Sequence, residues 1–203
     1  MKTTKKGFTL IELIVVIAII GVLAAILVPT MLGYVRKSKI SSANSAASSV
    51  YKGINSALTE LDEEGIDVGG LHILKWNGTA WATGGTTDTD VITNTDVLKR
   101  FTSKVSNFFA DISKVKEGQA ALKGGGCIAF AGRTDSTYTG TYPGGVVTTD
   151  TYEGYSNKVG IALKDAIGVA SGVKPTGKSD QAGKLTAAEG DYKTLQGKIS
   201  TAG

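Results

Sequence analysis

The chain has 203 residues, a length that suggests one modest domain plus an N-terminal segment. Removing the three lysines of residues 1–7 from the 22 basic residues leaves 19 against 18 acidic ones, so the remaining chain is nearly neutral and does not favour a dedicated nucleic-acid surface. Cys127 is the only cysteine, which excludes an intramolecular disulfide.

Residues 8–28 form an almost purely apolar stretch, FTLIELIVVIAIIGVLAAILV, which follows Lys2, Lys5 and Lys6. As an α-helix with a rise of about 1.5 Å per residue, this stretch spans roughly 32 Å, close to the thickness of a bilayer core. Its one charged side chain is Glu12, and a carboxylate inside a membrane costs about 3 kcal/mol. Because the stretch has no other charged side chain, we expect the group that compensates this cost to lie outside it.

The N-terminus closely resembles that of bacterial type IV prepilins and their pseudopilin relatives over roughly residues 1–50. The resemblance rests on the sequence KKGFTLIE at residues 5–12, the apolar run that follows it, Gly21 and Pro29. It implies that a membrane aspartyl peptidase cuts after Gly7 and that the new N-terminal amine of Phe8 is methylated. It also implies that Glu12 pairs with the Phe8 amine of a neighbouring subunit, and that Gly21 and Pro29 lie where the helix kinks or melts.

The resemblance also implies a function and a set of partners. The chain is expected to be a homo-oligomeric subunit of a helical surface filament, a pilus that serves adhesion or twitching motility. The expected partners are a prepilin peptidase and methyltransferase, the cytoplasmic membrane before assembly, and a pilus assembly platform. The mature protein would move from a single-pass position in the cytoplasmic membrane to an extracellular filament.

Three other interpretations remain open. A pseudopilin of a type II secretion or DNA-uptake system would share the helix and its chemistry. A monomeric membrane-anchored binding domain would retain residues 1–7. In an ordinary signal anchor, Glu12 would reach to the membrane interface instead of pairing with another subunit.

The helix is predicted to continue past Pro29 to about residue 63, because apolar residues recur at three- and four-residue steps beyond the membrane segment. These residues include Val50, Ile54, Leu58 and Leu61. Residues 41–49, which precede Val50, are rich in Ala and Ser, and such small side chains permit close approach of a packed domain or of neighbouring helices in a bundle. Pro29 should kink this helix, and Gly65 should end it.

Residues 64–203 are predicted to form an extracellular globular head, loosely ordered from about residue 172. Expected elements are a strand at 71–76, a loop at 77–96, an amphipathic helix at 95–115 capped by Asn94 or Thr95, and a helix at 186–199. Further strands are expected at 127–131, 136–142, 145–151 and 158–163. The fold class is therefore α+β: a long N-terminal helix, transmembrane in its first half, with a head built on an antiparallel β-meander plus a second amphipathic helix.

No residue pattern favours an enzyme, a cofactor or a metal site. His72 is the only histidine and has no ligands at a suitable spacing, and Trp76, Trp81 and Cys127 are expected to pack in the head. Asp88 and Asp90 resemble only the start of a calcium loop. Residues 172–179 match the pattern of a phosphate-binding loop, but the strand, helix and parallel sheet that such a loop requires are not predicted around them.

Overall fold

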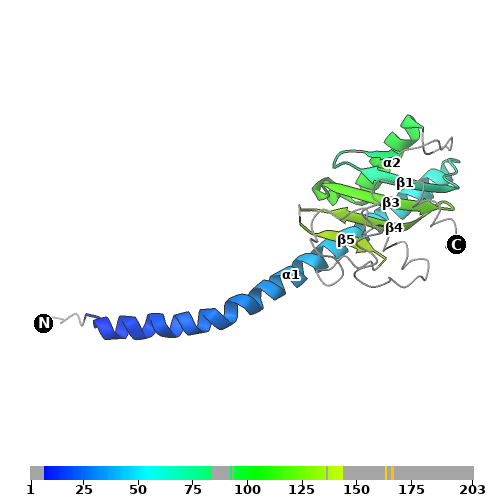
Figure 1. Ribbon diagram of the computed structural model, residues 1–203. Helices are drawn as coiled ribbons and strands as arrows, with labels where there is room; N and C mark the ends of the chain where they lie inside the picture. The colour runs from blue at the N-terminus through cyan, green and yellow to red at the C-terminus, as the bar shows by residue number, and fades with distance from the viewer. Residues whose placement is uncertain are drawn as a thin grey trace, which may run out of the picture. The chain divides into compact units, whose positions relative to one another are not determined.

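The computed structural model describes residues 7–83, 94–135 and 137–143, together with positions 92, 163 and 166 (Figure 1). The chain divides into two compact units, Met1–Lys39 and Ile40–Gly203, which are described separately below. The elements in chain order are α1 (Leu10–Glu63), β1 (Leu71–Trp76), β2 (Trp81–Thr83), α2 (Thr95–Phe108), the 3₁₀-helix η2 (Ala110–Lys114), β3 (Glu117–Lys123), β4 (Gly126–Arg133) and β5 (Thr139–Tyr142). This composition confirms the predicted α+β class.

The long helix α1 confirms the prediction of a single helix to residue 63. From residue 40 onward it buries one face, formed by Ala43, Ala47, Val50, Gly53, Ile54, Ala57, Leu58 and Leu61. Its end is fixed by Gly65, which has a φ of +77°. The Gly65 amide donates to the Asp62 carbonyl and the Ile66 amide to the Leu61 carbonyl, both at 2.9 Å. These two bonds satisfy carbonyls that the last helical turn leaves without partners.

The second unit contains a five-stranded antiparallel sheet with the strand order β2-β1-β3-β4-β5. Strands β3, β4 and β5 follow one another as a meander, whereas β1 and β2 form a separate hairpin whose β1 pairs with β3. The segment that contains α2 and η2 connects β2 to β3. The sheet is therefore a meander extended by a hairpin, and the second helix lies within its connection.

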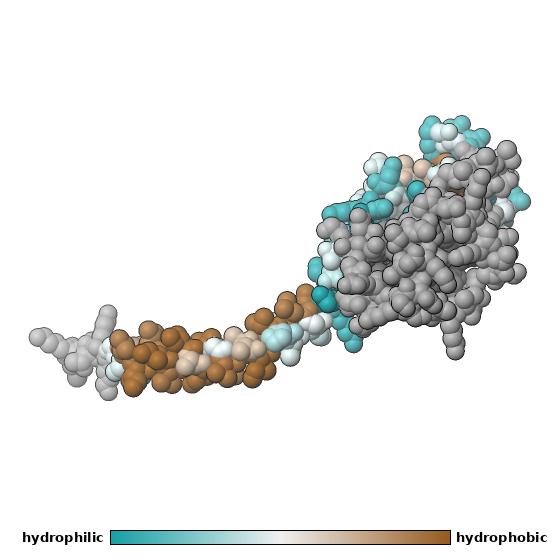
Figure 2. Space-filling view, in the orientation of Figure 1, coloured by the Kyte–Doolittle hydropathy of each residue, from teal (hydrophilic) through white to brown (hydrophobic). Residues whose placement is uncertain are grey.

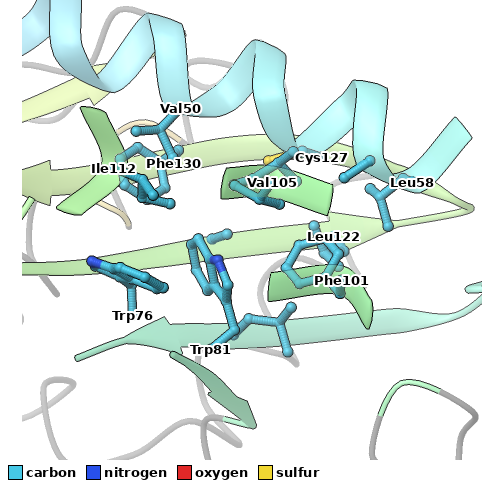
Figure 3. Close-up of a cluster of buried hydrophobic side chains, with 14 of the residues drawn as sticks. Val50, Leu58, Trp76, Trp81, Phe101, Val105, Ile112, Leu122, Cys127 and Phe130 are labelled. Atoms are coloured by element: carbon cyan, nitrogen blue, oxygen red, sulfur yellow. The ribbon is translucent and has the colours of Figure 1, made fainter. Parts of the chain in front are cut away.

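One face of the sheet packs against α1 and α2 through a hydrophobic core. Figure 3 shows Val50 and Leu58 of α1 directed toward side chains from the strands, including Phe130 and Leu122. Trp81 lies at the centre of an aromatic group, with ring centroids 5.5 Å from Trp76, 5.6 Å from Phe101 and 6.2 Å from Phe130. Trp76, Trp81 and Cys127 therefore pack in the core as predicted.

A row of three paired glycines runs across β3, β4 and β5 on the face that meets α1. Gly118 is the partner of Gly132, and Gly132 is the partner of Gly140. The Phe130 ring covers the first two, since a Cβ at Gly118 or Gly132 would lie only 2.8 Å or 2.7 Å from its atoms. At Gly140 an added Cβ would overlap the backbone of Ala43. The glycine row thus allows the backbone of α1 to lie directly on β5.

This contact makes Gly140 a sensitive position. We expect Gly140→Ala to lower the free energy of unfolding by about 3 kcal/mol, because the backbone of Ala43 cannot move aside as a flexible side chain could. Thermal unfolding of the detergent-solubilised chain would measure the change. Gly126→Ala is the matched control, since a Cβ there meets its nearest atom, Asn55 Oδ1, at an ordinary 3.6 Å; equal melting temperatures of the two variants would contradict the prediction.

Two polar side chains of α1 also bind the sheet. Asn44 Oδ1 accepts a hydrogen bond from the Thr141 amide at 2.9 Å, and Asn55 Oδ1 accepts one from the Cys127 amide at 3.0 Å. Each bond satisfies a backbone donor of a strand that faces the helix. Together with the glycine row, these bonds fix the register between α1 and the strands β4 and β5.

Helix α2 is joined to the end of α1 by ion pairs. Lys104 Nζ lies 2.7 Å from Glu60 Oε2 and 2.8 Å from Glu64 Oε1, and Arg100 lies 3.2 Å from Glu64. Hydrogen bonds to Glu60 and Glu64 raise the pKa of Lys104, and the hydrogen bond from Lys104 lowers the pKa of Glu64. The lowered pKa of Glu64 stabilises the fold at pH values above the glutamate pKa of the unfolded chain, about 4.3. The raised pKa of Lys104 stabilises the fold at pH values below the lysine pKa of the unfolded chain, about 10.4.

We therefore expect Lys104→Met to lower the melting temperature at neutral pH. The difference from the wild type should shrink as the pH falls below about 4, because Glu64 then becomes protonated and its pairing is lost in both proteins. Melting curves from pH 3 to pH 8 would measure this. Lys99→Met, which removes an exposed ion pair with Asp96, is the control and should change little; a Lys104→Met effect that did not vary with pH would count against the ion pairs.

Other predicted elements need correction. The strand at 71–76 has the predicted bounds, but the predicted loop at 77–96 contains β2, and β3 was not predicted. The helix predicted at 95–115 begins at the predicted cap, where Asn94 Oδ1 accepts from the Asp96 amide, but it ends at Phe108. Phe109 has φ −140° and ψ 84°, and η2 follows it.

The strand predicted at 127–131 is longer, and that predicted at 136–142 is shorter, since β5 begins at Thr139. Of the segment 158–163, only Leu163 is described, and it is helical and buried. The segments 145–151, 172–179 and 186–199, along with Asp88 and Asp90, lie outside the described residues.

Candidate functional site

The N-terminus of α1 forms a capping box built from Thr9 and Glu12. The Thr9 amide donates to Glu12 Oε2 at 2.8 Å, and the Thr9 hydroxyl donates to the same oxygen at 2.7 Å. In return, the Thr9 Oγ1 atom accepts a hydrogen bond from the Glu12 amide at 3.3 Å. Threonine and glutamate three residues apart satisfy each other's backbone donors at a helix start, which explains why α1 begins at Leu10.

These bonds give Glu12 a neutral partner within residues 8–28, and the counter-charge expected outside this stretch stays a prediction. Thr9 carries no charge but supplies two donors to the carboxylate, and both bonds end on Oε2. The other oxygen, Oε1, accepts no hydrogen bond from any residue that the structure describes. Glu12 is thus held in one orientation by its own chain, with one oxygen still available.

Phe8 and Glu12 lie at the same place on the molecule. They line a shallow hollow of about 320 Å³ together with Ile11, Val15 and Val16, and its surface is almost entirely apolar. Phe8 is 87% exposed, and Gly7, Phe8 and Thr9 precede the helix without regular structure. A carboxylate, a chain segment open to a protease and an apolar surface are therefore brought together within one turn of the helix start.

The structure does not bring Gly21 and Pro29 to this hollow. Both lie farther along α1, and the helix is unbroken at each of them. A Cβ at Gly21 would meet nothing within 4 Å. One turn at Pro29 is supported by a side chain, since the Thr30 hydroxyl donates to the Leu27 carbonyl at 2.9 Å.

The first unit exposes its apolar side chains. Figure 2 shows them as a brown surface around the N-terminal part of α1, and every residue from 7 to 39 is exposed. By length and composition, α1 is able to cross a membrane. No residue of its most apolar segment is buried. This surface is unusual for a protein in water and requires a lipid or protein environment.

In the described part of the second unit, histidine and acidic side chains do not form a comparable site. His72 is buried, with Nε2 2.9 Å from the Gly69 carbonyl oxygen. Across the described ranges, no three His, Cys, Asp or Glu side chains come close enough to hold a metal ion. Cys127 is buried in β4, and burial raises the pKa of its thiol far above the ordinary value.

The sequence predicted Gly7, Phe8 and Glu12 as site residues, and Thr9 was not among them. The signal was present in the order Thr9-Leu10-Ile11-Glu12, which is the spacing of a capping box in front of an apolar run. The charge of Glu12 predicts a counter-charge as its partner, whereas Thr9 supplies neutral donors. Thr9 is therefore the residue that the structure adds to this site.

Comparison with known proteins finds similarity in the same segment. The family described as "Prokaryotic N-terminal methylation motif" matches residues 2–28. The type IV major fimbrial protein FimA of Dichelobacter nodosus is 43% identical over 67 residues, which are 33% of this chain and 42% of FimA. The type IV major pilin protein PilE1 of Neisseria gonorrhoeae is 47% identical over 60 residues, 30% of this chain and 34% of PilE1.

A shorter match, 58% identical over 43 residues, links the chain to the fimbrial protein EcpC of Eikenella corrodens and covers 21% of this chain and 28% of EcpC. No solved structure matches the chain. The chain thus spans less than half the length of the relatives it matches. Within that limit, residues 2–28 carry the prokaryotic N-terminal methylation motif of prepilins, and about a third of the chain is similar to type IV major pilins and fimbrial proteins.

Proposed function

We propose that this chain is a structural subunit of a type IV pilus that polymerises through the first part of α1. The observation that carries the proposal is Glu12, a carboxylate with one available oxygen in the hollow beside Phe8, at the start of an exposed apolar helix. An enzyme is not part of this proposal, since the matched relatives are named as pilins and fimbrial proteins.

In this proposal a prepilin peptidase first removes residues 1–7 by cutting after Gly7. The methylation motif supports this step, and so does the local structure, because Gly7 is exposed and lies outside the helix. Cleavage removes Lys2, Lys5 and Lys6 and leaves a charged amine on Phe8. The methylated amine keeps its positive charge and can therefore pair with the Glu12 carboxylate of another subunit.

Assembly then depends on the amine of one subunit reaching Glu12 of another. Thr9 occupies Oε2, so the incoming amine would bind Oε1. Such a pair offsets part of the cost of a charged carboxylate in an apolar environment, because the charge gains a direct counter-charge. Because an unpaired Glu12 carboxylate costs free energy and the Phe8 amine of a neighbour lowers that cost, Glu12 sets the register between subunits in this proposal.

In this proposal the apolar helix can leave the membrane because other copies of the helix replace the lipid around it. Side chains of residues 8–28 that face lipid in the monomer would be covered by the equivalent helices of other copies in the filament. Gly21 and Pro29 are proposed as the positions where this helix melts or kinks during packing. Residues 64–203 would then form the extracellular head, held by α1, and the pilus assembly platform would supply new subunits from the cytoplasmic membrane.

Electron microscopy of cells that express the chain, joined to N-terminal sequencing of purified fibres, tests this function. We expect long surface fibres composed mainly of this chain, with methylated Phe8 as the first residue. Native protein that begins at Met1 would contradict the proposal, as would cells that process the chain fully but carry no fibres.

A further inference from the structure

The apolar surface of α1 does not end with residues 8–28. The helix continues unbroken through Pro29, and the next large side chains remain exposed: Met31 at 61%, Leu32 at 66%, Tyr34 at 77% and Val35 at 49%. Between Glu12 and Arg36 there is no charged side chain. As a helix, Leu13–Val35 spans roughly 35 Å, which fits a bilayer core of about 30 Å with a modest tilt.

This longer segment places a charged group at each of its ends. Glu12 would then lie at one membrane surface instead of inside the hydrocarbon, and the first cation would lie at the other. Tyr34 stands one turn before Lys37, where an aromatic ring with a polar tip is favoured at a membrane interface. The limits of the membrane segment are therefore set by charge, and they lie farther along the chain than the apolar run alone predicts.

Three cations follow immediately: Arg36, Lys37 and Lys39, here called the basic belt. All three are exposed, and in the described part of the chain none of them forms an ion pair. By contrast, Arg100, Lys104 and Arg133 of the second unit are paired with carboxylates. The basic belt thus presents three exposed positive charges, without carboxylate partners among the described residues, beside an exposed apolar helix surface.

The side of the membrane makes these charges unusual. With residues 1–7 in the cytoplasm, as the proposed function has it, the basic belt lies on the exported side. Positive charges close to a membrane segment favour the cytoplasmic side, so three of them here oppose the orientation that Lys2, Lys5 and Lys6 favour. An anionic partner on the exported side would compensate for that conflict.

We propose that the basic belt binds anionic phospholipid headgroups of the outer leaflet and thereby fixes the depth of the unassembled chain in the membrane. A phosphodiester oxygen matches both the guanidinium of Arg36 and the ammonium groups of Lys37 and Lys39. Each cation near an anionic surface contributes about a fivefold preference. The proposal rests on the membrane stage of the proposed function but not on filament assembly.

The test uses the uncut full-length chain in vesicles of phosphatidylcholine and phosphatidylglycerol. A bimane fluorophore is attached at Leu32→Cys, one turn before Arg36, in a Cys127→Ala background. Quenching is compared when either lipid carries brominated acyl chains. We expect phosphatidylglycerol to be preferred near the fluorophore by about fivefold or more, and the preference to weaken in about 1 M NaCl, where charges are screened within about 3 Å.

Two matched variants separate charge from shape. The variant R36Q/K37Q/K39Q should lose the preference, whereas R36K/K37R/K39R, which keeps all three charges, should retain it. Equal quenching by both lipids in the wild-type chain would overturn the proposal, and so would a preference that survives in the glutamine variant.

Cross-linking of copies within the vesicles distinguishes a protein partner. Cross-links that disappear in the glutamine variant, without any lipid preference in the wild type, would assign the belt to a second copy and overturn the proposal. A chain that carbonate extracts from the vesicles would contradict the membrane stage of the proposed function as well. A chain that inserts but shows no preference would contradict the lipid proposal alone.

Discussion

Replacing Glu12 by valine should abolish filament formation while the chain still inserts into the membrane. Insertion should not be impaired, because valine replaces the charged group at the end of the membrane segment with an apolar side chain. Assembly should fail, because the Phe8 amine of an incoming subunit would then be buried among apolar helices without a counter-charge, at a cost of about 3–5 kcal/mol. Surface fibres counted by electron microscopy, and chain recovered in the membrane fraction, would measure the two effects.

Glu12→Gln is the control that separates the charge from the helix cap. Glutamine at this position can still complete a capping box with Thr9, so the start of α1 should be preserved. It carries no charge, and we expect it to lose fibres as valine does. Normal fibres from the glutamine variant would show that Glu12 acts through the cap and would refute pairing with the amine.

A bulky residue at Gly7, such as Gly7→Trp, should leave an uncut precursor that stays in the membrane. The fold itself should tolerate the change, because a Cβ at Gly7 would meet nothing within 4 Å. Any loss of processing therefore reflects access of the peptidase to the bond after residue 7 and not a defect in folding. Intact mass spectrometry should find the precursor heavier by all seven leader residues together with the substituted side chain, and microscopy should find no fibres.

Gly21→Ala provides the comparison for Gly7. It also adds a side chain in open space on the exposed part of the chain, but at a position remote from the cleaved bond. This variant should be cut and methylated normally. A Gly7→Trp chain with the mature mass would rule out cleavage after residue 7.

The parts of the fold that follow simple periodicity could be predicted from the sequence. Val50, Ile54, Leu58 and Leu61 repeat at helical spacing, and all four are buried in α1. The strand at 71–76 is a short, mostly apolar segment with glycines before it, and its predicted bounds match β1. Where one local pattern dominates, the structure follows it.

Strand β3 could not be predicted because its residues have little strand preference of their own. Its sequence, EGQAALK, contains no β-branched or aromatic residue, and Gly118 resembles the end of a helix. The strand exists because it pairs with β1 on one side and with β4 on the other. The pairing with β1 joins segments far apart in the sequence and is invisible to a local pattern.

The helical periodicity of residues 95–115 continues past the point where the helix stops. Val115 lies on the predicted apolar face and is buried, yet its carbonyl accepts a hydrogen bond from Trp76 Nε1 at 2.7 Å. The next residue, Lys116, donates its amide to the Arg133 carbonyl at 2.9 Å. Tertiary partners therefore take over the backbone here, and the chain leaves the helix to enter the sheet.

The capping box leaves each copy one free acceptor, Glu12 Oε1, which is a different group from the donor that the copy offers, the Phe8 amine. Thr9 saturates one oxygen of Glu12, so under the proposed pairing a subunit receives one neighbour there and offers its own Phe8 amine to another. Such a contact joins two different surfaces, so two copies cannot satisfy each other as they do in a symmetric dimer. Repeated addition of copies forms a ring if the rotation between neighbours closes, and an open helical filament if it does not. The polymer formed by the proposed pairing would have two chemically distinct ends, one with a vacant carboxylate and one with an unmatched amine.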